Sequence, residues 1–208
     1  MTGAELMAAA KAADQIDKSI GIIAKVVGKL KTHPDIAAQK LAQALGEVSK
    51  TLQVVDGATA EYLSLGIDDG ALARNSKLLL EIDGGRLAAE VQRGRGHCHM
   101  ILQIYQTYLN KWFSSVLNTT EYDEVQQVFV RLGDADGNLF HELEQVATKL
   151  QAEASSVLDL VVQGDEGGAR QRVRSSLSAL RPLRKTIAKT METIYKLQGE
   201  FVDITGAV

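Results

Sequence analysis

The chain has 208 residues, of which 45% are hydrophobic and 24% charged, a composition typical of a folded protein rather than a disordered one. Its net charge of -3 gives no general attraction to nucleic acid or anionic lipid, which disfavours a role dominated by phosphate binding. With 2 prolines and 5% aromatic residues, the chain favours helices over strands. We therefore expect one all-α domain over residues 1–208.

The first two predicted helices form a helical hairpin. Apolar residues recur at alternating steps of four and three over residues 9–30 and again over 41–62, the spacing that turns one helical stripe toward a partner. Pro34 disfavours helical geometry at His33 and suits the first turn of a new helix, so we expect a sharp reversal there. The second helix should end near Gly66, because glycine suits a helix C-cap.

A shorter amphipathic segment over 71–82 and a long helix over 87–117 come next. Asp83-Gly84-Gly85 separates them. The stripe of the long helix comprises Leu87, Val91, Gly94, Cys98, Ile101, Tyr105, Tyr108 and Trp112. In this phase Tyr108 and Trp112 share the core face, whereas Phe113 points aside.

The remaining chain predicts two further helical stretches and their turns. Asn118 has a glutamate three positions later, a capping box that should begin a helix. Glycines over 133–137 interrupt this helix before it resumes to about residue 161, and 164–168 form the last turn. The final stripe spans 173–201, where Pro182 should cause a kink. Together the stripes predict an antiparallel up-and-down bundle of four long helices plus one or two shorter helical segments.

The patterns that could carry chemistry are incomplete, so we expect no enzymatic activity, no cofactor and no metal site. Asp134-Ala135-Asp136-Gly137 resembles the middle of a calcium loop but lacks the leading carboxylate and the closing glutamate. His97, Cys98 and His99 are potential metal ligands, but adjacent helical positions point to different faces and need ligands from elsewhere. Cys98 lies on the apolar stripe, where a small hydrophobic role is expected.

Cysteine content and hydropathy predict a cytoplasmic protein. The single cysteine cannot form an internal disulfide, and a reduced thiol without a signal sequence favours a reducing compartment. No run of residues approaches the roughly 18 consecutive apolar positions of a membrane-spanning helix. We therefore expect no integral membrane segment.

Two groups of residues are candidates for partner binding. The aromatic residues Tyr105, Tyr108, Trp112 and Phe113 are spread more widely than one core face, and exposed aromatic side chains often dominate interface energies. The second group is the arginine-rich start of the last helix, Arg170, Arg172 and Arg174, which follows an acidic segment over 118–166. These charges either pair across the helical hairpin or form a docking surface for an acidic partner.

The sequence therefore predicts a helical interaction module, an adaptor, regulatory or self-associating bundle that acts through helix-face contacts. Its expected partner is another protein or a second copy of the chain. We expect no nucleic acid, because the arginine-rich helix has no interleaved aromatic residues, and we identify no small-molecule substrate. The alternative is a membrane-acting bundle whose first helix lies on anionic lipid. That helix carries Lys11, Lys18, Lys25, Lys29 and Lys31, but also Asp14 and Asp17.

Overall fold

The part of the chain that the computed structural model describes is all α, with helices joined by turns. This part comprises residues 21, 35–67, 70, 72, 75–133 and 139–205, and no strand occurs in it. The all-α prediction is confirmed. Apart from Gly21, the helix expected over 9–30 lies outside the described residues.

The helices follow the expected order along the chain. Their bounds are α2 Asp35–Ser64, α4 Ser76–Asp83, α5 Arg86–Ile104, the π-helix η1 Tyr105–Leu109, α6 Asn110–Val116, α7 Thr119–Gly133, α8 Leu139–Val162, α9 Glu166–Ser175 and α10 Leu177–Thr205. The helix expected over 87–117 is thus a continuous rod made of α5, η1 and α6. The final helix is interrupted by a turn at Ser176, before Pro182, which lies inside α10.

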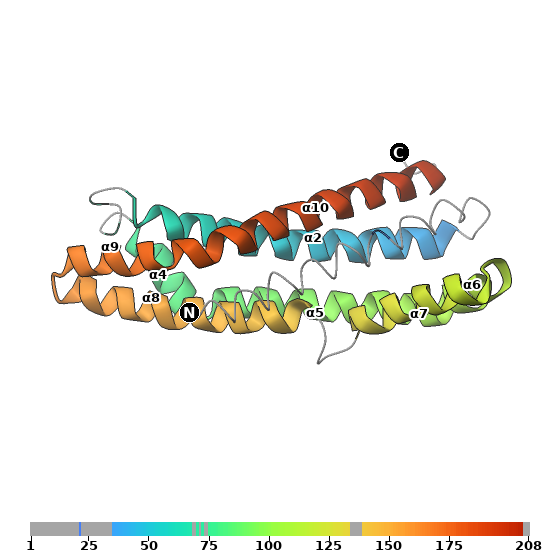
Figure 1. The fold of residues 1–208 in the computed structure, drawn as a ribbon, viewed down its shortest axis with the longest axis horizontal. Helices are drawn as coiled ribbons and strands as arrows, with labels where there is room; N and C mark the ends of the chain where they lie inside the picture. The colour runs from blue at the N-terminus through green and yellow to red at the C-terminus, as the bar shows by residue number, and fades with distance from the viewer. Residues whose placement is uncertain are drawn as a thin grey trace.

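The described helices lie side by side along one long axis (Figure 1). Helix α2 packs between α10 and α5, and α5 packs in turn on α7 and α8. Helix α8 also contacts α4 and α9. The start of α2 lies beside the end of α5, so these two helices run in opposite directions.

Apolar stripes account for these contacts. Every stripe residue expected over 41–62 is buried: Leu41, Leu45, Val48, Leu52, Val55, Thr59 and Tyr62. The short helix α4 is likewise held by its apolar side chains, with Leu79 and Ile82 buried. Burial of such side chains is the main stabilising term for a helical protein of this kind.

Local sequence signals also fix several helix ends. The predicted capping box is present: the Glu121 backbone N–H donates to Asn118 Oδ1 over 3.0 Å, and Asn118 N–H donates to Glu121 Oε2 over 3.4 Å. At the other end of the molecule, the Asp165 side chain accepts a hydrogen bond of 2.8 Å from Gly168 N–H and caps α9. These caps satisfy backbone donors that a helix start otherwise leaves unpaired.

Candidate interaction groove

The long rod α5-η1-α6 contains one turn of π-helix. The Asn110 backbone N–H donates to the Tyr105 carbonyl, five residues earlier, instead of the residue four before it. A π-turn of this type adds one residue to the helix and rotates everything that follows. The phase of the apolar stripe therefore changes at Tyr105.

This change affects Tyr108, for which burial was predicted, and Phe113, which was predicted to point aside. Leu109 and Phe113 are buried, each 2% exposed, at steps of four from Tyr105. Tyr108 is 42% exposed and Trp112 is only partly buried. The expectation that Tyr108 lies on the core stripe while Phe113 points aside is therefore wrong, because it assumed a regular α-helix throughout, whereas Trp112 still packs in part against the core.

The two buried aromatic candidates belong to the core. Tyr105 stacks on Phe129 with ring centroids 4.3 Å apart, and Phe113 packs near both rings. Asn110 Oδ1 accepts hydrogen bonds from the hydroxyls of Tyr105, over 3.0 Å, and Tyr122, over 2.7 Å. Burial, and then the neighbouring Tyr122, raise the pKa of Tyr105. Tyr105 and Phe113 thus present no surface to a partner in this fold.

Tyr108, in contrast, lines a surface groove of about 430 Å³ between α2, α5 and η1. Ala44 and Ile104 form its buried floor, and Met100, which is 46% exposed, supplies a second large apolar side chain beside Tyr108. Lys40 and Gln43 line the groove from α2. An apolar floor with polar groups around it is the usual composition of a protein-binding site.

Charged groups are arranged along the groove. The Lys40 ammonium donates to the Tyr108 hydroxyl over 3.1 Å and lies 4.9 Å from the centre of its ring, within the range of a cation–π contact. At the far end, Glu47 accepts a hydrogen bond of 2.5 Å from Lys50. That bond is the main cause of the lowered pKa of Glu47.

A second groove, of about 370 Å³, lies near the opposite end of α2, between α2, α4 and α5. Two of its charged lining residues pair with each other, since Arg86 lies 2.5 Å from Glu81, and Lys77 lies 3.8 Å from the same carboxylate. Val54 is its exposed apolar residue, at 38%. None of its described lining residues is aromatic, so it offers a weaker anchor than the Tyr108 groove.

The predicted arginine surface is engaged within the fold. Arg172 pairs with Glu153 on the neighbouring helix α8 over 2.9 Å, and Arg174 donates to the Gly66 carbonyl, just past the end of α2, over 2.6 Å. Arg170 donates to the Glu166 carbonyl over 3.4 Å. Of these contacts, only the Arg172–Glu153 pair joins opposite charges across the hairpin, and binding of an acidic partner there stays a prediction.

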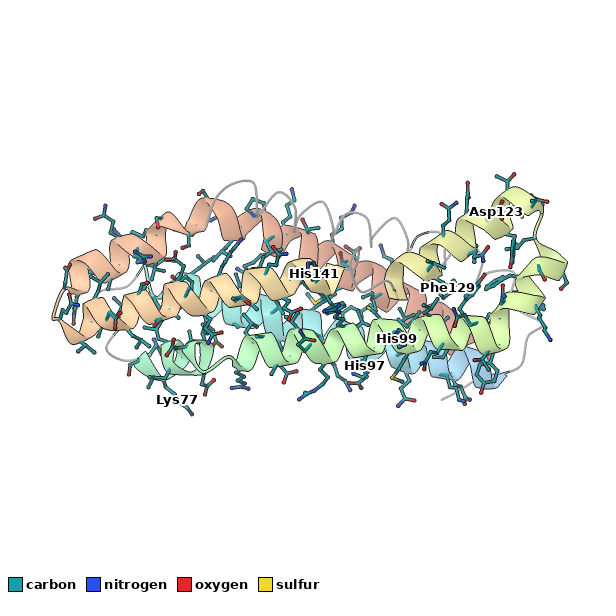
Figure 2. The ribbon with its side chains drawn as sticks, turned by 90° about the horizontal axis from the view of Figure 1, so that it is seen from below. Lys77, His97, His99, Asp123, Phe129 and His141 are labelled. Carbon is teal, nitrogen blue, oxygen red and sulfur yellow. The ribbon has the colours of Figure 1, made fainter. Side chains whose placement is uncertain are left out.

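The histidines on α5 are potential metal ligands. His97 and His99 are on α5 and His141 is on neighbouring α8 (Figure 2). Cys98 is 1% exposed within the apolar stripe, as expected. In the described ranges, no group of three or more His, Cys, Asp or Glu residues could hold a metal ion.

Two other predictions concern residues that the structure does not describe: the calcium-like loop over 134–137, and the lysines of the first helix. Among the described helices, none combines the length and hydropathy needed to cross a bilayer.

Comparison with protein-family models, curated proteins and solved structures found no match for the chain. Tyr108 was predicted from the sequence, whereas Lys40 and Met100 were not, because they line one groove only through the packing of α2 on α5. The wide spread of aromatic residues was the one available signal.

Proposed function

We propose that the chain is a non-enzymatic helical interaction module that binds a protein partner in the groove between α2, α5 and η1. One observation carries the proposal. The π-turn directs the Tyr108 side chain away from the core, and this residue is 42% exposed. π-Turns cost helix stability and occur frequently at functional sites. A tyrosine held beside an exposed methionine is typical of an interface anchor.

The arrangement of Tyr108 supports binding in a second way. Lys40 contacts both its hydroxyl and its ring, so the side chain is already ordered before a partner arrives. A preordered side chain loses less conformational entropy on binding than a mobile one. The buried floor of Ala44 and Ile104 leaves room for apolar side chains of an amphipathic helix.

We further propose that the module is the antiparallel up-and-down bundle of four long helices expected from the sequence, working in the cytoplasm. Contacts between distant segments support this scaffold: Arg184 on α10 forms a two-bonded pair with Asp56 on α2, at 2.8 and 3.1 Å. This pairing raises the pKa of Arg184.

Capture experiments with matched baits test the function. The full chain, Tyr108→Ala and Tyr195→Ala would each be used to recover partners, including untagged copies of the chain, from cells that express it. Tyr195 is the control because it is 48% exposed and its hydroxyl also accepts a hydrogen bond, from Gln53, but it lies on α10.

A partner recovered by the wild-type chain and by Tyr195→Ala should fall about tenfold or more with Tyr108→Ala, the effect of losing an interface anchor. Equal recovery by all three baits would contradict the proposal. Binding to anionic liposomes that disappears on deleting residues 1–31 would instead favour the membrane-acting alternative.

A further inference from the structure

The stripe of α2 residues that lines the groove carries a positive charge at one end and a negative charge at the other. Lys40, Gln43 and Glu47 follow one another at steps of three and four, so they lie on one face of the helix. Lys40 and Gln43 are exposed and Glu47 is partly so. Seven residues of helix separate the two charges by about 10 Å.

Such a stripe is complementary to a reversed copy of itself. If two α2 helices lie antiparallel about a two-fold axis that crosses between Gln43 and Ala44, Lys40 of each copy faces Glu47 of the other. The axis that pairs the α2 helices also brings the two copies of α5 together, with Met100 near the centre. Symmetry therefore produces two ion pairs flanking one apolar contact.

We infer that the occupant of the Tyr108 groove is a second copy of this chain, held by reciprocal Lys40–Glu47 pairs around Met100 and Tyr108. The inference rests on the proposed function and names its partner. A two-fold interface buries the same patch on both copies and closes after two chains, so the product is a dimer.

Both charges are available for this pairing. No carboxylate in the described part of the chain pairs with Lys40, whose polar contact there is the Tyr108 hydroxyl. Glu47 pairs only with Lys50 on its own helix, among the described residues, in an exposed contact three positions apart. Exposed pairs of this kind contribute little stability, so Glu47 can exchange or share its partner at low cost.

Charge also fixes the register. Sliding one copy of α2 by three residues would bring Lys40 level with Lys50 of the other copy, and both lysines are exposed. Like charges brought together at an interface are strongly unfavourable. The alignment centred between Gln43 and Ala44 avoids this contact and gains both ion pairs.

Sedimentation equilibrium of the full chain over a concentration series tests the inference. The apparent mass should rise from 22.5 kDa toward twice that value. Lys40→Glu and Glu47→Lys should each weaken dimerisation about tenfold or more, because each reversal places like charges in both symmetric pairs. Lys185→Glu, an exposed charge reversal on α10, is the control and should leave dimerisation unchanged.

Rescue distinguishes the proposed contact from a general effect of charge. The double variant Lys40→Glu/Glu47→Lys should dimerise again, and the two single variants should associate with each other when mixed. Circular dichroism should show that every variant keeps its helicity, because these side chains lie at the surface.

A wild-type chain that stays at 22.5 kDa throughout would overturn the inference, as would a dimer that both reversals leave intact. If the chain is monomeric while another protein is lost from the Tyr108→Ala bait, the proposed function stands and only the second copy is excluded.

Discussion

The two halves of the rod from Arg86 to Val116 follow different rules. In α5 the predicted stripe is buried at steps of four and three, from Leu87 through Val91 and Cys98 to Ile101. Beyond Tyr105 the buried residues follow at steps of four, because η1 inserts a residue. The stripe of the first half lies in the core, whereas in the second half the aromatic side chain of Tyr108 lies at the surface. One altered hydrogen-bonded turn is therefore enough to convert a core position into a surface site.

Phe113→Ala and Trp112→Ala should show the largest difference in free energy of unfolding. We expect Phe113→Ala to lower the free energy of unfolding by about 3–5 kcal/mol, since it removes a fully buried ring. Trp112→Ala should cost only about 1–2 kcal/mol, because part of its ring remains in water. Urea unfolding followed by circular dichroism measures both. The opposite order would place the core stripe in the regular α-helical phase.

Gly94 and Gly96 test the packing of α5, the regular α-helical half of the rod. A Cβ on Gly94 would lie 2.7 Å from Thr51 Cγ2 and clash with the Phe140 ring, whereas a Cβ on Gly96 meets no atom within 4 Å. We expect Gly94→Ala to destabilise by about 1–3 kcal/mol through overpacking. Gly96→Ala should stabilise by about 0.5–1 kcal/mol, since alanine favours helix. Thermal unfolding of both variants checks this, and equal effects would contradict the close packing of α5 on α2 and α8.

Substitution of Asn110 tests how much its side-chain hydrogen bonds stabilise the region of the π-turn. Asn110→Ala leaves the Tyr105 and Tyr122 hydroxyls without their acceptor, and we expect a loss of about 1–2 kcal/mol. Replacing both tyrosines by phenylalanine in the same variant should recover much of that loss. Urea unfolding of the double-mutant cycle measures the coupling, and independent, additive effects would show that Asn110 does not link the two rings.

Tyr108 should give the smallest effect on folding. Tyr108→Ala and Tyr195→Ala remove similarly exposed rings, and we expect each to change unfolding free energy by about 1 kcal/mol or less. Only Tyr108→Ala should weaken association. A Tyr108→Ala variant that unfolds would move this side chain back into the core.

Much of the fold could be predicted because its signals are local. The capping box at Asn118, the glycine turn at Gly84-Gly85 and the stripe over 41–62 each depend on residues close in sequence. The π-turn could not be predicted in this way. Tyr108 and Leu109, like Trp112 and Phe113, are apolar neighbours, so the sequence fits either phase equally well after Tyr105. Tertiary packing chooses between the two phases.

The site was only partly predictable for the same reason. The crowding of aromatic residues pointed to Tyr108 within a group of four. In the arginine group, Arg172 pairs with Glu153 and Arg174 donates to the Gly66 carbonyl within the fold. Lys40 and Met100 are far apart in sequence from each other and carry no motif. Their role depends on the packing of two antiparallel helices.

Hydroxyl-radical footprinting of the chain, at a concentration low enough to keep it monomeric, tests most directly whether the π-turn exposes Tyr108. Oxidation of Tyr108 should proceed at a rate close to that of exposed Tyr195, while Tyr105 and Phe113, each 2% exposed, stay protected. Protection of Tyr108 to the level of Tyr105, together with oxidation of Phe113, would contradict the phase change and remove the basis of the groove.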